Sequence, residues 1–132
     1  MSNILYNAIR TPDGTVLESL HGWDYKTYTD SITGKVYGVD GGLNYLRRTG
    51  DYEDCDELSI MYDNSTHEKI REVFKWGSRG KTGKGPTKYL VLKEMETEHI
   101  QKILETQKHI HGTVVELVFK DELEYRKANP II

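Results

Sequence analysis

The sequence predicts an α+β fold in which an N-terminal antiparallel β-sheet of hairpins packs with a C-terminal pair of helices. Residues 1–62 are rich in β-branched and aromatic side chains and are interrupted by turn sequences. Residues 94–129 instead repeat their apolar side chains with the period of a helix. The 132 residues fit a single domain, because about 100–200 residues commonly form one.

Two hairpins are expected in the N-terminal half. Pro12-Asp13-Gly14 lies between the first two strands, and this triplet suits a tight turn because proline fixes φ and glycine permits a positive φ. The tetrapeptide SITG joins the next two strands. Leu58, Ile60 and Tyr62 alternate as a further strand, whereas residues 43–48 fit either a strand end or a helical turn. The four hairpin strands are expected at residues 4–11, 15–20, 24–30 and 35–40.

The middle segment, residues 63–93, mixes signals. Ser65 and Glu68 have the spacing of a capping box, which predicts a short helix starting there. Residues 72–77 and 88–93 resemble strands on either side of a loop over residues 77–86, which contains four glycines. Glycines let a backbone approach a ligand closely, so this loop is a candidate contact segment.

The last third, residues 94–129, predicts two helices separated by Gly112. Thr97 is expected to cap the first helix. The second covers residues 113–128, where Glu122 and Arg126 have the i, i+4 spacing of a supportive ion pair. Its expected core stripe contains Val114, Leu117, Val118 and Tyr125, widened by Phe119 and Leu123.

Composition excludes several classes of protein. There is no apolar run of the roughly 18 residues that a spanning helix needs, and the first ten residues lack the core of a signal peptide. A single cysteine cannot form an internal disulfide, which fits a reducing cytosol. The net charge of −3 argues against generic binding of duplex DNA. We expect a cytoplasmic protein without a membrane partner.

Charge is unevenly distributed along the chain. Residues 51–57 carry five carboxylates and no basic side chain, whereas residues 69–93 carry eight lysines and arginines against a single acidic residue, Glu72. The basic segment fits contacts with phosphates or, equally, a solvated face. The acidic segment suits a protein partner.

No catalytic or metal motif is present in the sequence. The His and Asp spacings match no known metal site, so we expect no metal and no cofactor. Cys55 lies among carboxylates, which raise the pKa of a thiol and make it a poor nucleophile. A minor alternative is a small nucleotide hydrolase that uses His21, Asp24 and Asp40. We therefore expect that the chain is not an enzyme.

Arginines beside glycines and aromatic residues are the strongest candidates for binding a ligand. Such segments suit a nucleotide, because arginine matches phosphate geometry and an aromatic ring can stack on a base. Trp76 fits a core position equally well, and one of the two adjacent arginines fits an exposed ion pair. The candidate residues are Arg10, His21, Tyr45, Arg47, Arg48, Trp76, Arg79 and Lys81.

Several segments resemble a group of small tailed-phage proteins of uncharacterised activity. These are NAIRTPDGTVLESLH, DYKTYTD, VDGGLNYLRR and the C-terminal stretch from WGSRGKTGKGP to ELEYRK. Gly22-Trp23 departs from that group, which often has a basic residue and a second histidine there. In source, size and layout the chain is also similar to the Thoeris anti-defence sponges. These sponges bind cyclic ADP-ribose-type signals without cleaving them.

The resemblance implies a phage anti-defence protein that sequesters a cyclic nucleotide, either of the cyclic ADP-ribose type or a cyclic dinucleotide. A sponge gains from a site at a subunit interface, so we expect a homo-oligomer. The alternative is an inhibitor that docks on a host enzyme through the acidic segment 51–57.

Overall fold

A computed structural model describes residues 3–80 and 84–130. The α+β class is confirmed, because antiparallel strands dominate the first half and helices the last third. The chain forms two compact units, residues 2–64 and residues 65–132. In the described part of the chain, no helix has both the length and the apolar character needed to cross a bilayer.

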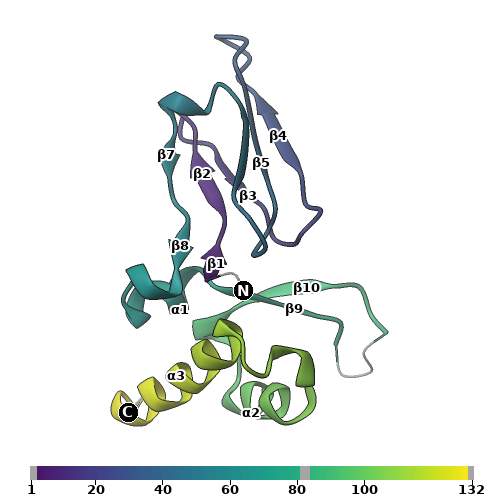
Figure 1. The fold of residues 1–132 in the computed structure, drawn as a ribbon, viewed down its shortest axis with the longest axis vertical. Coiled ribbons are helices and arrows are strands. Elements are labelled where there is room, and N and C mark those ends of the chain that lie inside the picture. The colour runs from purple at the N-terminus through teal and green to yellow at the C-terminus, as the bar shows by residue number, and fades with distance from the viewer. Residues whose placement is uncertain (1–2, 81–83, 131–132) are drawn as a thin grey trace. The chain divides into compact units, whose positions relative to one another are not determined.

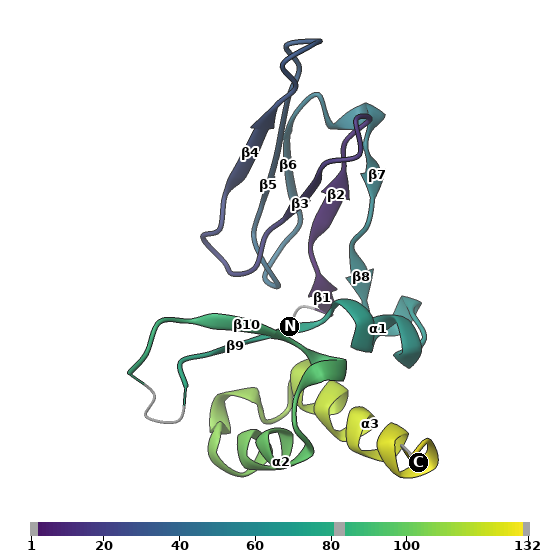
Figure 2. The same cartoon turned by 180° about the vertical axis from the view of Figure 1, so that it is seen from behind.

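The N-terminal unit consists of short antiparallel strands (Figures 1 and 2). Two three-stranded sheets have the orders β3-β2-β7 and β4-β5-β6, and β1 pairs with β8. The strands are β1 (Ile4–Tyr6), β2 (Ala8–Arg10), β3 (Val16–Glu18), β4 (Lys26–Thr29), β5 (Val36–Asp40), β6 (Arg47–Gly50), β7 (Asp56–Glu57) and β8 (Ile60–Met61). Two 3-10 turns, Tyr52–Asp54 and Tyr62–Asn64, follow β6 and β8.

The two three-stranded sheets share one hydrophobic core. Ile9 and Leu17 come from the first sheet, Tyr37 and Val39 come from the second, and all four are at most 8% exposed. Tyr37 and Val39 alternate with Gly38 along β5, so the inner face is apolar and Gly38 belongs to the outer face. The unit is therefore a small β-sandwich.

Both predicted hairpins are confirmed as β2–β3 and β4–β5. In the first turn Gly14 has φ +91°, and the backbone N–H of Thr11 donates to the carbonyl of Thr15 at 2.8 Å. The undecided segment 43–48 ends in a strand, because Arg47 starts β6. The strand expected over residues 58–62 is shorter than predicted and contains only Ile60 and Met61.

The C-terminal unit contains three helices and one hairpin. These elements are α1 (His67–Val73), β9 (Lys75–Ser78), β10 (Lys88–Val91), α2 (Thr97–Thr106) and α3 (Val114–Ala128), with 3-10 turns at Leu92–Glu94 and Lys108–Ile110. The predicted second helix agrees with α3 to within one residue at its start. Strand β9 starts at Lys75, so the prediction of a strand over 72–77 was wrong for its first three residues.

Both predicted helix caps in this unit were wrong by one residue. Thr66, not Ser65, caps α1 and accepts from the backbone N–H of Lys69 at 3.4 Å. Thr97 is the first residue of α2 instead of its cap. The hydroxyl of Thr97 accepts a hydrogen bond from Arg126 at 2.9 Å, so it serves a tertiary contact instead of a backbone cap.

Aromatic side chains join the hairpin to α3. Phe119 is fully buried and makes edge contacts with Phe74 and Trp76, with ring centroids 5.8 and 5.3 Å apart. On α3, Val118 is buried as predicted. Leu117, which we placed in the core stripe, is 43% exposed, so that assignment was wrong. The buried face is centred on Val118, Phe119 and Glu122, which is one residue further along the helix.

Glu122 is fully buried and forms the centre of an ionic cluster. Arg71 donates to both of its carboxylate oxygens at 2.9 Å, and Arg126 donates to one at 2.7 Å. His67 Nε2 lies 2.8 Å from Oε1. Burial by itself raises the pKa of Glu122, but the hydrogen bonds from these three residues outweigh burial and lower it to about 2. The cluster joins α1 to α3.

A candidate ligand-binding surface on the N-terminal unit

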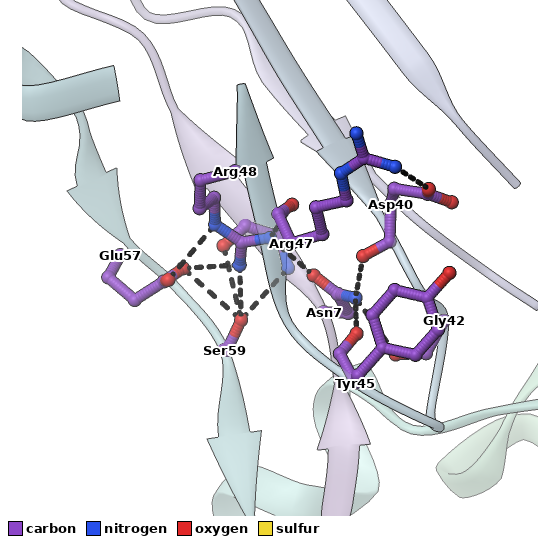
Figure 3. A network of polar contacts seen from close by, with 9 residues as sticks. Asn7, Asp40, Gly42, Tyr45, Arg47, Arg48, Glu57 and Ser59 are labelled. Atoms are coloured by element: carbon purple, nitrogen blue, oxygen red, sulfur yellow. Dashed lines mark hydrogen bonds and ion pairs between the residues drawn. The ribbon is translucent and has the colours of Figure 1, made fainter. Parts of the chain in front are cut away.

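The side chain of Asn7 organises the loop between β5 and β6. Asn7 is 1% exposed, and its Nδ2 lies within hydrogen-bond distance of three backbone carbonyl oxygens. These belong to Asp40 at 3.0 Å, Gly42 at 2.9 Å and Tyr45 at 3.1 Å (Figure 3). A buried carbonyl without a partner is costly, so Asn7 holds this loop in one conformation.

Arg48 holds Asn7 in turn. Its Nη1 donates to Oδ1 of Asn7 at 2.8 Å. The same guanidinium makes a bidentate contact with Glu57, at 3.1 and 2.7 Å, and donates to Oγ of Ser59 at 2.9 Å. These bonds connect β6 to the β7 region, two strands that do not pair through their backbones. Because only 8% of its side chain is exposed, Arg48 serves the fold.

A second loop, residues 19–25, packs against the first. Ser19 Oγ accepts from the backbone N–H of Gly42 at 2.9 Å and donates to the carbonyl of Asp24 at 2.7 Å. Gly42 has φ +52°, and a Cβ there would overlap the backbone of His21. Both the backbone conformation and the close approach therefore require glycine at this position.

Together the two loops and the adjacent strands present exposed aromatic and cationic side chains. Trp23 is 92% exposed, Tyr25 54% and Tyr45 46%. The Arg47 side chain is 62% exposed, and its Nη1 lies 3.6 Å from the carboxylate of Asp40. That separation exceeds a hydrogen bond, so the ion pair leaves the donors of the guanidinium available to an anion.

The structure separates the predicted site residues into groups. The first group belongs to the N-terminal unit: His21 lies on the loop of residues 19–25, Tyr45 on the loop between β5 and β6, and Arg47 at the start of β6. Arg10, at the other end of β2 from Asn7, pairs with Asp56 at 3.8 Å.

Trp76 and Arg79 belong to the C-terminal unit. Trp76 packs edge-on against Phe119 and stacks on His109 with an interplanar angle of 18°. Arg79 Nε donates to the carbonyl of Gly85 at 3.3 Å. Lys81 lies outside the described residues.

Asp24 and Asp40, the two carboxylates of the alternative hydrolase site, each accept a hydrogen bond from the backbone. Asp24 Oδ2 accepts from the backbone N–H of Leu20 at 2.7 Å, and Asp40 Oδ1 accepts from that of Gly41 at 2.8 Å. Both carboxylates thus hold loop backbone. Among the residues that the structure describes, no three His, Cys, Asp or Glu side chains are grouped closely enough to hold a metal ion.

Sequence reasoning missed Asn7 and Tyr25. Nothing local distinguishes Asn7, since its partners are 33 to 41 residues away. For Tyr25 a signal did exist. Gly38 interrupts the centre of a strand, and a glycine there often marks a close approach. The side chains of Thr49 and Tyr25 occupy this space.

Comparison of the chain with protein-family models, curated proteins and solved structures finds no match. The function is therefore inferred from the geometry of the chain's own residues.

Proposed function

We propose that this chain is a non-catalytic phage anti-defence protein that binds a cyclic nucleotide signal in the host cytosol and sequesters it uncleaved. The observation that carries the proposal is the exposed pair of Tyr45, on a loop that a buried network holds in place, and Arg47, the first residue of the strand that follows. In this proposal the guanidinium of Arg47 contacts a phosphate and the ring of Tyr45 stacks on a base.

Rigidity of the loop supports tight binding. Ordering a loop on binding reduces affinity, and a loop that is already fixed avoids that loss. The carbonyl of Tyr45 is held by Asn7, and Arg48 holds Asn7. Arg47, the residue next to Arg48, therefore projects from a fixed backbone position. Preorganisation of this kind suits a protein whose only task is to retain a ligand.

The alternative, an inhibitor that docks through the acidic segment 51–57, has less support. Four of its carboxylates have partners within the unit. Asp51 accepts from the backbone N–H of Val36, Asp54 pairs with Lys35, Asp56 with Arg10 and Glu57 with Arg48. The three ion pairs, of Asp54, Asp56 and Glu57, offset much of the negative charge that would steer a basic partner.

Isothermal titration of the purified chain with cyclic ADP-ribose isomers, cyclic dinucleotides and 3′,5′-cyclic mononucleotides tests the proposal. We expect one class to bind with micromolar affinity or better and to be recovered intact by chromatography. Arg47→Ala is expected to weaken binding about 10- to 100-fold, as for loss of a charged hydrogen bond.

Lys35→Ala is the matched control, because Lys35 precedes β5 at the end opposite Asp40, the partner of Arg47. It removes the same charge from the same unit, so binding is expected to be unchanged. Binding no tighter than millimolar for every ligand would refute the proposal, and recovery of cleaved ligand would point to an enzyme. Light scattering of the same sample measures the proposed homo-oligomer.

A further inference from the structure

The ring of Tyr25 lies across the outer face of the β4-β5-β6 sheet. Its hydroxyl lies 3.1 Å from Oγ1 of Thr49 on β6. A Cβ at Gly38 on β5 would collide with Thr49 and lie 3.2 Å from Cε1 of Tyr25. Gly38 thus provides the space in which the ring lies on the sheet. Since 54% of Tyr25 remains exposed, the ring is supported from below and open to solvent.

Tyr45, on the loop after β5, also lies against a glycine. A Cβ at Gly41 would overlap the carbonyl of Tyr45 and lie 2.7 Å from Cδ2 of its ring. Gly41 also has φ +105°, a conformation that side chains rarely adopt. Tyr45 is 46% exposed. Two exposed tyrosine rings therefore each lie against a glycine, Tyr25 against Gly38 within β5 and Tyr45 against Gly41, the residue that follows β5.

Asp40, the ion-pair partner of Arg47, lies between Gly38 and Gly41 along the chain. Asp40 follows Gly38 by two residues, so both belong to the outer face of β5, and Arg47 pairs with Asp40 across the ladder. Gly38 and Asp40 are two residues apart, which is roughly 7 Å of strand at about 3.3 Å per residue, and Gly41 lies beyond the end of the strand. Each ring therefore has its own support and can stack on a separate base.

We propose that this surface takes a ligand with two bases joined through phosphate, that is, a dinucleotide. Tyr25 and Tyr45 each stack on one base, and Arg47 contacts the linking phosphate between them. This inference rests on the proposed function and narrows it, because a cyclic ADP-ribose offers a single adenine. It also assigns a contact to Tyr25.

Titration with cyclic di-AMP, 3′,5′-cyclic AMP and cyclic ADP-ribose tests this inference. We expect cyclic di-AMP to bind at least about 10-fold more tightly than either single-adenine ligand, as for one additional stacked base. Tyr25→Ala and Tyr45→Ala should each weaken binding of cyclic di-AMP by about 10-fold or more. Tyr25→Phe, which retains the ring but loses the hydroxyl, should bind cyclic di-AMP within about threefold of the unaltered chain.

Tyr52→Ala is the matched control, since Tyr52 is a similarly exposed tyrosine of the same unit, at 47%. Its affinity for cyclic di-AMP should be unchanged. Tight binding of cyclic ADP-ribose that Tyr25→Ala does not affect would overturn the two-base inference and leave the proposed function standing. If none of these three ligands binds, and no ligand of the wider panel binds either, both the two-base inference and the proposed function are refuted.

Discussion

The guanidinium of Arg48 lies 2.8 Å from Oδ1 of Asn7, and the amide nitrogen of Asn7 faces three backbone carbonyls of the next loop. Asn7 therefore links a buried cation to the backbone on which Tyr45 and Arg47 are mounted. The loop depends on a residue that is itself buried and 38 positions away from Tyr45 in the sequence.

Asn7→Ala is expected to destabilise the N-terminal unit by about 2–3 kcal/mol, because several buried polar groups lose their partner. Amide hydrogen exchange of peptides from residues 36–50 measures the change. Asn3→Ala is the control, since the side chain of Asn3 donates an exposed hydrogen bond to Asp63 at 2.8 Å. Equal exchange in the two variants would contradict the role of Asn7.

Gly38→Ala should displace the ring of Tyr25 and destabilise the N-terminal unit by about 1–3 kcal/mol through overpacking. The added methyl meets Thr49 and Tyr25. Two-dimensional NMR should show a changed environment for the Tyr25 ring protons. Gly14→Ala supplies the comparison, because open space surrounds that position and only its positive φ opposes the change. Unmoved Tyr25 signals in Gly38→Ala would show that the ring does not lie on the sheet.

Acid is expected to destabilise the C-terminal unit through Glu122. The pKa of Glu122 in the folded chain, about 2, is below its ordinary 4.5. The carboxylate therefore contributes stability above about pH 4.5, and this contribution is lost as pH falls from there towards 2. The contribution is about 3 kcal/mol, at about 1.4 kcal/mol for each pH unit.

Urea unfolding of a Trp23→Phe variant, followed through Trp76 emission, measures this loss, because Trp76 reports on the C-terminal unit. Adding Glu122→Gln should lower the free energy of unfolding at neutral pH. It should also flatten the pH dependence of that free energy between about pH 5 and pH 2, the range in which the carboxylate titrates. An equally steep dependence in the glutamine variant would assign the effect to other groups.

Adjacent residues on α3 should differ sharply in their contribution to stability. Val118→Ala is expected to cost about 1–3 kcal/mol, because Val118 is fully buried. Leu117→Ala should cost less than about 1 kcal/mol, since Leu117 is 43% exposed. Thermal unfolding of the two variants compares them directly. A larger loss for Leu117→Ala would contradict the observed register of the helix.

Local signals were sufficient to predict the hairpins and α3. Pro12-Asp13-Gly14 determines its turn through residues that are neighbours in sequence, and α3 follows the periodicity of its side chains. The burial of Glu122 could not be predicted in this way. A glutamate four residues before Arg126 is typical of an exposed pair, and its other partners, His67 and Arg71, lie 55 and 51 residues away.

The candidate surface was predicted in part. The sequence pattern of arginine beside glycine and tyrosine named Tyr45, which lies on the fixed loop, and Arg47, which begins the strand after it. Strand alternation sends Arg47 and Arg48 to opposite faces, but the sequence did not decide whether residues 43–48 end in a strand, so it could not tell which arginine is exposed. The side chain of Arg47 is 62% exposed, whereas that of Arg48 is 8% exposed. Tyr25 was missed because a tyrosine beside a strand is ordinary and its signal, Gly38, lies elsewhere in the sequence.

The contact between β6 and the β7 region also has an evolutionary consequence. Arg48, Asn7, Glu57 and Ser59 satisfy one another's hydrogen bonds, so replacing any one leaves a charge or a donor without its partner. These four positions should therefore be inherited as a set. In divergent relatives they should change together, whereas Tyr25, Tyr45 and Arg47 are free to vary with the ligand.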